Sequence, residues 1–512
     1  MRGWSLTTGR RARFGVGRRL ILAGGAAGLA LGAAMTAACG GGDSRPTAAP
    51  PAHSAQPTST AAGVLSAPDV SSGDYFVSTQ QCSNTGSGSR DEPFCTIQRG
   101  VDALDPGQTL TIFPGVYPER IAVSRSGSEG APIVIQGTSA AEVIIEAGCS
   151  RFPCPEDEFP SEGVFDGLNV TGRSFVTIRQ ITIQNAPQHG IGAEDTNGLT
   201  IEQVITRATG MSGINVYDSS ELAVRRSEVT RANLGVEYSG GDVEYPEEAI
   251  SIVNTTRFDI DGNHLHDNWK EGIDVKVGSA DGRVHHNMVE RQCAVGIYIN
   301  EAHRVEVFGN EIADAGSIEV DGSVVPCVDA IGEEADGGDG IMLAVGDLGD
   351  IGDGTLSDVS VFRNVVRRTR YACLVFWDEL RESGAGAGSM MAVRVFNNVF
   401  YDCGRSEWGP GIVLDDAGES VIVNNIVART GEGGIVGNGV GRPGNLVSHN
   451  LFFEAGEPAG EAAIEADPLF RDPSQGDFRL AERSPAVDAG TDAGLPFAGA
   501  APDIGAFEQG LE

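Results

Sequence analysis

The stretch G272-IDVKVGSADGRVHHNMVERQCAV-G296 begins with glycine followed by isoleucine, and the same pair returns 24 residues later (296 − 272 = 24). Short runs inside it alternate aliphatic with polar residues, which is the period of a half-buried β-strand. One strand of the unit opens with the Gly-Ile pair, and a few polar residues separate it from the strand before. The stretch therefore predicts a structural repeat built from short strands.

The glycine-aliphatic pair recurs from about residue 175 onward, and several gaps are close to 23 residues. Its occurrences are Gly190-Ile191, Gly213-Ile214, Gly235-Val236, Gly272-Ile273, Gly296-Ile297, Gly340-Ile341, Gly411-Ile412 and Gly434-Ile435. The preceding strands carry asparagines in phase, at Asn263, Asn287, Asn310, Asn364, Asn398, Asn425 and Asn450. This period predicts an all-β parallel β-helix, a single-stranded solenoid whose coils bury their aliphatic residues against one another. We expect the asparagines to hydrogen-bond along the stack as an internal ladder.

Both ends of the repeat region carry recognisable segments. The segments D74-YFV-S78, P93-FCTI-Q98, D105-PGQ-T109 and F113-PGV-Y117 resemble the start of right-handed parallel β-helix proteins of the polysaccharide-lyase-like (pectin-lyase-like) kind. This resemblance implies a short capping helix near residues 96–104. The segments D467-PLF-R471, G476-DFRL-A481, S484-PAVDA-G490 and P502-DIGAF-E508 resemble the C-terminal part of bacterial surface β-helix proteins. We expect a β-helix domain over 74–510, with an insertion at about 315–358 and a closing segment at about 465–510.

The N-terminus has the pattern of an export signal. Six arginines precede or begin the apolar run L20-ILAGGAAGLALGAAMTA-A38, which ends in small residues before Cys39. M35-TAA-C39 resembles a bacterial lipobox, which implies lipidation of Cys39. We expect a signal peptide at 1–38 and a Pro/Ser/Thr/Ala-rich tether at 39–73. The protein is then an extracytoplasmic lipoprotein anchored to a membrane of the bacterial cell envelope, or a secreted protein if Cys39 is not lipidated.

Cysteine usage agrees with an oxidising compartment, because eight cysteines remain when Cys39 is set aside. Proximity in the sequence suggests two disulfides, position within the repeat suggests a third, and the fourth pair is what remains. The four are, in that order, Cys82–Cys95, Cys149–Cys154, Cys373–Cys403 and Cys293–Cys327. The chain contains no Cys-x-x-Cys pattern, so we expect no zinc site.

Charge narrows the range of ligands. The formal net charge is −35, which repels nucleic acid, so we expect no nucleic-acid partner. Of the 36 basic residues only Lys270 and Lys276 are lysines, and both lie among carboxylates. Lysine can lose its proton at an accessible pH and arginine cannot, so these two positions are candidates for acid–base chemistry.

The strand around Lys276 predicts the geometry of a site. If Ile273 and Val275 point into the coil, Asp274 and Lys276 point out on one face, about 6.7 Å apart. Glu248 lies one coil before Glu271, since 271 − 248 = 23. The oxygens of Glu248, Glu271 and Asp274 suit a calcium ion, and a neighbouring lysine of lowered pKa could remove the C5 proton of a uronic acid.

This arrangement resembles the family 6 polysaccharide lyases (chondroitinase B and alginate lyases), in which a calcium-binding glutamate stands five residues before the lysine base. Glu271 and Lys276 have that spacing. The arginine of that family has no match on the strand one coil further on, which offers Asn300, with Arg304 beyond it. The family 9 lyases, with an aspartate-rich calcium site and a lysine, resemble the stretch more loosely.

We therefore expect a monomeric, surface-tethered, calcium-dependent polysaccharide lyase that cleaves an acidic glycan by β-elimination. Lys276, Asn300 and Arg304 are the predicted catalytic residues, and Lys270 and Trp377 the predicted contacts to the polysaccharide. The alternative is a non-catalytic β-helix surface lipoprotein for carbohydrate binding, adhesion or envelope structure. In that alternative the carboxylates and lysines form only a solvated network of ion pairs.

Four further groups of residues are weaker candidates for a site. Asp415 and Asp416 are either a carboxylate pair for glycoside hydrolysis or part of an ordinary turn. The Gly-rich run with Asp347, Asp350 and Asp353 is either a calcium loop or a flexible acidic loop. His285 and His286 are adjacent in a strand, so alternation places them on opposite sides and predicts that they cannot serve one metal. Trp377 could form a sugar-stacking wall with Trp408, or simply stack on a coil.

The lipid anchor can be tested directly. Replacing Cys39→Ser removes the acyl attachment point, so we expect the protein to leave the membrane fraction. Fractionation of cells, followed by mass spectrometry of the mature N-terminus, measures this outcome. Unchanged partitioning, with no lipid mass on Cys39 of the parent protein, would contradict the prediction.

Overall fold

The computed structural model describes residues 73–155, 158, 163–235, 248–330, 337–346, 352–383, 388–404 and 409–511. The predicted signal peptide, Cys39 and nearly all of the predicted tether lie outside these residues. None of the helices in the described ranges is long and apolar enough to cross a membrane.

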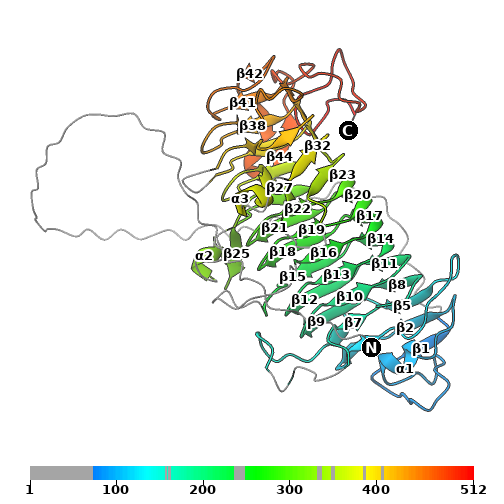
Figure 1. Cartoon of the computed structure of the whole chain (residues 1–512). Helices are drawn as coiled ribbons and strands as arrows, with labels where there is room; N and C mark the ends of the chain where they lie inside the picture. Colours follow the sequence, from blue (N-terminus) through cyan, green and yellow to red (C-terminus); the bar gives the residue numbers. More distant parts are fainter. Residues whose placement is uncertain are drawn as a thin grey trace, which may run out of the picture. The chain divides into compact units, whose positions relative to one another are not determined.

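Most described strands belong to three long parallel sheets that wind into a right-handed parallel β-helix (Figure 1), which confirms the predicted fold. Sheet I contains β1 (Tyr75–Val77), β2 (Thr109–Ile112), β5 (Ile133–Gly137), β8 (Val176–Arg179), β11 (Leu199–Glu202), β14 (Ser220–Arg225), β17 (Thr256–Asp261), β20 (Ala280–His285), β23 (His303–Phe308), β29 (Ser360–Phe362), β33 (Arg394–Phe396), β37 (Val421–Val423) and β40 (Leu446–Ser448), joined by β28 (Thr355–Ser357), β32 (Ser389–Met391) and β36 (Ala417–Gly418).

The other two sheets complete each coil. Sheet II contains β3 (Gly115–Tyr117), β6 (Val143–Glu146), β9 (Thr182–Ala186), β12 (Ile205–Thr209), β15 (Glu228–Thr230), β18 (His264–Asn268), β21 (Met288–Gln292), β24 (Glu311–Ala313), β30 (Val365–Arg367), β34 (Val399–Tyr401), β38 (Ile426–Ala428), β41 (Leu451–Phe453) and β42 (Ile464–Glu465). Sheet III contains β4 (Ile121–Ala122), β7 (Leu168–Asn169), β10 (Ile191–Glu194), β13 (Ile214–Tyr217), β16 (Ile250–Val253), β19 (Ile273–Lys276), β22 (Ile297–Asn300), β27 (Ile341–Val345), β31 (Leu374–Asp378), β35 (Ile412–Val413) and β39 (Ile435–Val436).

The predicted glycine-aliphatic pairs begin strands of sheet III. Ile273 lies in register between Ile250 of the preceding coil and Ile297 of the next, and all three side chains are buried in one continuous core. Aliphatic residues thus repeat in register from coil to coil, and each coil covers the apolar edge of its neighbour.

One pair was predicted wrongly. Gly235 does not begin the strand that follows β13, because Ile214 pairs with Ile250. The backbone nitrogen of Gly235 instead donates to the carbonyl of Gly210 at 2.8 Å. The coil between β13 and β16 is therefore longer than the repeat suggested, and Val236 lies outside the described residues.

The predicted asparagine ladder is confirmed. The Nδ2 atom of every asparagine but the last donates to Oδ1 of the asparagine in the next coil at 2.9–3.0 Å, and all seven side chains are buried. The ladder runs through Asn263, Asn287, Asn310, Asn364, Asn398, Asn425 and Asn450. The residue before each rung has a left-handed backbone, as at Gly262 (φ 64°) and His286 (φ 53°). A two-residue turn therefore joins sheet I to sheet II, and its buried polar groups are paired along the stack.

This turn overturns the expectation for the paired histidines. Because His286 is left-handed, strand alternation ends at His285, and the two side chains lie on the same side. Their Nδ1 atoms are 2.8 Å apart. The prediction that they cannot serve one metal is wrong.

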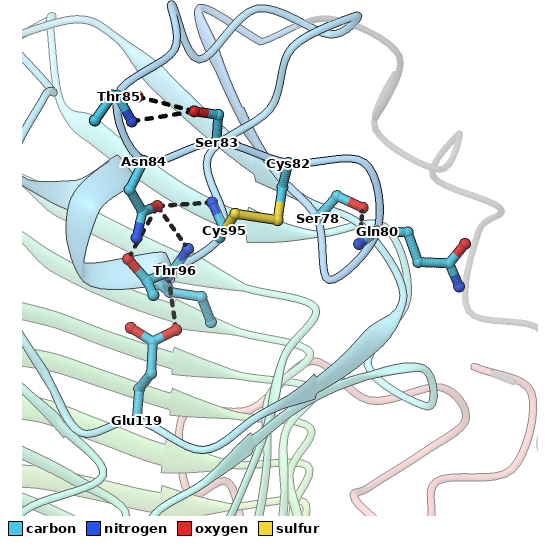
Figure 2. Close-up of a disulfide and its surroundings, with 10 residues drawn as sticks. Ser78, Gln80, Cys82, Ser83, Asn84, Thr85, Cys95, Thr96 and Glu119 are labelled. Carbon is cyan, nitrogen blue, oxygen red and sulfur yellow. Dashed lines mark hydrogen bonds between the residues drawn. A yellow bond between two sulfur atoms is a disulfide. The ribbon is translucent and has the colours of Figure 1, made fainter.

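The N-terminal end carries the predicted short helix, as α1 (Ile97–Val101), which packs against β1 and β4. The carboxylate of Glu119 accepts hydrogen bonds from the backbone nitrogens of Ile97 and Gln98 at 2.8 and 3.1 Å, which satisfies the free N–H groups of a helix start. Figure 2 shows Asn84 accepting from the backbone of Cys95 beside the Cys82–Cys95 disulfide.

All four predicted disulfides are formed. The Cys293–Cys327 bond ties β21 to an outgrowth made of the antiparallel pair β25 (Ser317–Val320) and β26 (Ser323–Pro326), followed by α2 (Cys327–Ala330). Strand β27 returns to sheet III within the range 315–358, so the predicted insertion is interrupted by a coil strand. A further helix, α3 (Glu379–Ser383), follows β31.

Near the C-terminus, the antiparallel pair β43 (Phe470–Asp472) and β44 (Asp477–Leu480) flanks a 3₁₀ turn at Pro473–Gln475. Phe478 and Ile504 pack on aliphatic residues of sheet II, including Val399 and Leu451, in a second core. The closing segment therefore buries its own aromatic residues on the side of the last coils.

The ladder gives a prediction about stability. Asn364→Ala removes the partner of the Asn310 backbone N–H and of the Val307 carbonyl, both buried, so we expect a loss of about 3 kcal/mol in the free energy of unfolding. Urea unfolding followed by circular dichroism measures it. Asn438→Ala, at an exposed turn amide, is the matched control, and equal losses in the two variants would contradict the ladder's role.

Candidate active site

Four of the predicted site residues, Glu248, Glu271, Asp274 and Lys276, gather on the outer side of sheet III. The backbone nitrogen of Ala249 donates to the carbonyl of Glu271 at 3.0 Å, so Glu248 and Glu271 occupy equivalent places in consecutive coils, as predicted. Asp274 pairs in register with Ser251 below and Tyr298 above. Strands β16, β19 and β22 thus bring three carboxylates, a lysine and a phenol together.

Lys276 is the centre of this cluster. Its Nζ lies 2.6 Å from Oε1 of Glu248 and 3.3 Å from Oδ2 of Asp274. Glu248, Asp274 and Lys276 are only 2%, 0% and 3% exposed. Alternation turns Asp274 and Lys276 away from the aliphatic core, yet they are enclosed. The alternative of a solvated ion-pair network is therefore wrong, because this network is buried.

The protonation of Lys276 differs from the prediction. Burial alone would lower the pKa of Lys276, but the negative charges of Asp274, Glu248 and Glu271 outweigh it and raise the pKa. The expected lowered pKa is therefore wrong for the cluster as it stands. Here the ammonium group serves as counter-ion to the carboxylates.

The pKa values of two carboxylates in the cluster, Asp274 and Glu271, are also raised. Burial raises the pKa of Asp274 well above its usual range, and Glu248 and Glu271 add to this effect against the attraction of Lys276. Burial and the charge of Glu248 also raise the pKa of Glu271. The Oε2 atom of Glu248 and the Oδ1 atom of Asp274 are buried without a hydrogen-bond partner in the described part of the chain, and Oδ2 of Asp274 has only the contact with Lys276 at 3.3 Å. The cluster holds more negative charge than its lysine can satisfy.

This donor set is chemically suited to calcium, because it offers hard carboxylate oxygens that lack partners. However, Glu248, Glu271 and Asp274 do not bring one oxygen each within 4.8 Å of one another, since the described residues contain a single such group of His, Cys, Asp or Glu and it lies elsewhere. Lys276 stands between Glu248 and Asp274. The residues fit the ion by chemistry, and binding it requires Lys276 to move from its present contacts.

The remaining predicted residues divide into two groups. Asn300 ends β22 and is buried, and Trp377 lies two coils beyond it through the register Asn300, Ala344 and Trp377. Lys270 is half-buried next to Glu271. Arg304 is not in the cluster, because it belongs to β23 of sheet I and forms an exposed ion pair with Asp281 at 2.5 Å.

The other carboxylate candidates hold turns together. Oδ1 of Asp415 accepts from the backbone nitrogen of Asn438 at 2.6 Å, and Asp416 contacts Arg381 and Asn438. Asp353 accepts from the backbone and hydroxyl of Thr355. These contacts support the turn interpretation. Asp347, Asp350 and Trp408 lie outside the described residues.

Sequence reasoning missed a column of polar residues on the same face. Asn215, Ser251, Asp274 and Tyr298 are register partners on β13, β16, β19 and β22, and we call them the polar strip. Oδ1 of Asn215 and Oγ of Ser251 are also buried without a hydrogen-bond partner among the described residues. The sequence carried a signal for this column, namely a polar residue at the same position of consecutive strands. A strand that is buried on both faces is usually apolar throughout, so a repeated polar residue in it is unexpected.

Comparisons with known proteins agree with the fold. Residues 166–325, which include the whole cluster, match the family model described as "Right handed beta helix region". An uncharacterized protein of Bacillus subtilis (strain 168), YwoF, is 24% identical over 471 residues, which cover 81% of this chain and 92% of that protein.

Two solved structures are similar in outline. The pectate lyase Pel9A has 15% identity and a TM-score of 0.48, covering 85% of this chain and 96% of that one. The alginate lyase from Paenibacillus sp. has 14% identity and a TM-score of 0.43, covering 63% and 95%. Likenesses at this level concern the fold and do not assign an activity.

The stressed carboxylates predict a pH dependence. The pKa of Asp274 is raised in the folded state, so the folded protein binds protons more tightly than the unfolded chain, and stability falls as the pH rises from about 4 towards the raised value. The slope contributed by one full proton is about 1.4 kcal/mol per pH unit. In a chelator, Asp274→Asn should flatten the decline measured by urea unfolding from pH 4 to 8. Asp195→Asn, at an exposed turn after β10, should leave it unchanged, and equal slopes in all three proteins would contradict the prediction.

Proposed function

We propose that this protein is a carbohydrate-active β-helix protein that cleaves an acidic, uronate-containing polysaccharide by β-elimination at the cluster of Glu248, Glu271, Asp274 and Lys276. The observation that carries the proposal is the set of buried carboxylate oxygens on Glu248 and Asp274 without hydrogen-bond partners. Burying such atoms without a partner is costly, and the cost is tolerated where a ligand completes the site.

Glu248, Glu271 and Asp274 are the residues that would hold a calcium ion. Bound there, the ion would supply charge neutralisation of the sugar carboxylate and so acidify the neighbouring C5 proton. The polar strip gives the direction that an extended ligand would follow, since its four residues span about 14 Å along the solenoid at about 4.8 Å per coil. Asn215, Ser251 and Asp274 are buried, so the strip itself lies beneath the surface. A chain of sugars can follow such a column, with Trp377 further along the same face as an apolar surface.

The proton chemistry falls to Lys276 and Tyr298. Lys276 can accept a proton only when its carboxylate neighbours are engaged elsewhere, because burial then dominates and lowers its pKa. Its Nζ would take the C5 proton, the electron pair would form the C4–C5 double bond, and the C4–O bond would break. Burial, with the charge of Asp274, raises the pKa of Tyr298, so this phenol is protonated. Its hydroxyl would give that proton to the departing oxygen as the C4–O bond breaks.

One observation weighs against Lys276 as a base in the enclosed cluster. Lys276 is held by two carboxylates in the enclosed cluster, and their charges raise its pKa. A lysine that keeps its proton cannot accept the C5 proton, so the alternative of carbohydrate binding without cleavage follows if Lys276 stays in these contacts.

Cleavage of pectate, alginate and chondroitin, followed through the ultraviolet absorbance of unsaturated uronate products, tests the proposal. We expect one polymer to be cut in calcium and none after chelation. Lys276→Met keeps the length of the side chain and removes the base, so turnover should fall by about 10²–10⁴-fold. Arg257→Met, at an exposed basic residue of β17, should leave turnover within about twofold.

Glu271→Gln supplies the second arm. This change should weaken calcium affinity and be partly rescued by excess calcium, while Lys276→Met should not be rescued. An active protein that is indifferent to Lys276→Met and to chelation would overturn the lyase assignment. If none of the polymers is cut but one is bound, the binding alternative takes its place.

A further inference from the structure

A second cluster of chemically active side chains lies on another face of the solenoid. Asp261 ends β17, and His285 ends β20 directly beside it in register. His286 follows in the left-handed turn position. These three side chains are the group in the described residues whose ligand atoms all lie within 4.8 Å of one another.

The ligand atoms form a triangle of the size that a small metal ion requires. The Nδ1 atoms of His285 and His286 are 2.8 Å apart. Oδ1 of Asp261 lies 3.2 Å from Nδ1 of His285 and 3.6 Å from Nδ1 of His286. Ligands of a tetrahedral zinc ion lie about 3.3 Å apart, because zinc–nitrogen and zinc–oxygen bonds are about 2.0–2.1 Å long.

The hydrogen bonding of His285 fixes which nitrogen faces the triangle. Its Nε2 lies 2.9 Å from Oδ1 of Asp259, and a carboxylate only accepts, so Nε2 carries the hydrogen. In the neutral ring Nδ1 then presents a lone pair, which can accept from the Nδ1–H of His286 at 2.8 Å. The same nitrogen also lies 3.2 Å from Oδ1 of Asp261, which is an acceptor facing an acceptor. A carboxylate behind a histidine that turns its other nitrogen to an ion is a common arrangement in metal sites. Asp259 is also held by Arg225 and Arg283, so it serves as this supporting group.

The surroundings hold both rings in place. His285 stacks on Phe308 with ring centres 4.7 Å apart and an angle of 2° between the planes, and Phe308 stacks on Phe362 in turn. In the next coil Gly309 follows Phe308, and a Cβ there would lie 2.9 Å from Cδ2 of His286. The glycine therefore leaves room for the His286 ring. The side chain of His286 is 62% exposed, so the cluster is open to solvent on one side.

We propose that Asp261, His285 and His286 bind a divalent transition-metal ion of the zinc class, with the fourth position open to water or an exogenous ligand. Two nitrogens and one carboxylate oxygen match the preference of zinc and differ from the all-oxygen sites of calcium. The ion would link consecutive coils across β17 and β20. The expectation that the protein has no zinc site rested on cysteine patterns, and it is replaced by this proposal. The proposal of a zinc site does not depend on the proposal that the protein is a lyase.

Metal binding to the full chain tests the site. The protein is stripped with a chelator, dialysed and titrated with zinc chloride by calorimetry, and metal content is counted by mass spectrometry. We expect one zinc ion per chain at this site and no competition from calcium. Asp261→Asn and His286→Ala should weaken binding by about 100-fold or more, and Asp259→Asn by about 10–100-fold. Cobalt should give the visible absorption of a four-coordinate site, and this band should be lost in both ligand variants.

His449→Ala is the matched control. His449 occupies the same left-handed turn position before a ladder asparagine as His286 does. The Nδ1 atom of His449 contacts the hydroxyl of Ser448, whereas that of His286 contacts a carboxylate and a second histidine. It should bind zinc within threefold of the parent. Melting curves in chelator confirm that each variant folds, and the near-isosteric Asp261→Asn answers the question if His286→Ala does not fold. His266 of β18 contacts Glu228 and Asp267 and is the competing candidate for a metal ligand. Zinc binding that is unchanged in Asp261→Asn and His286→Ala, lost instead in His266→Ala, or absent from the parent protein would overturn the proposal.

Discussion

The two-residue turn between sheets I and II is the constraint on which the rest of the structure depends. In the seven coils of the ladder, each turn puts one residue in the left-handed region and buries one asparagine, which bonds to a carbonyl below and, except in the last coil, to the rung above. A left-handed residue other than glycine costs about 1–2 kcal/mol, and the buried amide would cost more if it had no partner. The hydrogen bonds that offset these two costs are made to neighbouring coils and not within one coil. The turn is stable only because its neighbours repeat it, so register, coil spacing and direction of winding are set together.

That repeated spacing also explains how the protein can hold charge inside. Equivalent positions of consecutive coils lie about 4.8 Å apart, so acidic residues one repeat apart become neighbours whether or not their charges agree. Glu248 and Glu271 are such a pair, and Lys276 supplies the opposite charge. The cluster thereby combines strong mutual attraction with unsatisfied oxygens. A ligand that brings positive charge is favoured there, because the carboxylates carry more negative charge than Lys276 neutralises.

The sequence was informative where the repeat is strict. The glycine-aliphatic pairs and the asparagines located most coils, and the cysteine spacings located the disulfides, because both depend on local periodicity. Predictions from the sequence were wrong where the repeat is interrupted. Gly235 has the right residue type within a longer coil, and His286 follows a strand whose alternation has already ended. Arg304 is four residues beyond Asn300 but on another sheet, because a corner intervenes. The pKa of Lys276 was misjudged because alternation gives the direction of a side chain and does not tell which charges enclose it.

The disulfides carry a consequence for how such a chain can acquire its structure. The four bonds join cysteines separated by 13, 5, 34 and 30 residues, so none reaches beyond the neighbourhood of a single coil. Parallel strand pairs are likewise made with the coil just before or just after. A chain emerging end first from a ribosome or a translocation pore can therefore complete and covalently lock each part before the remainder appears. Folding can then propagate from one end, because each folded coil offers its strand edges and apolar face to the next.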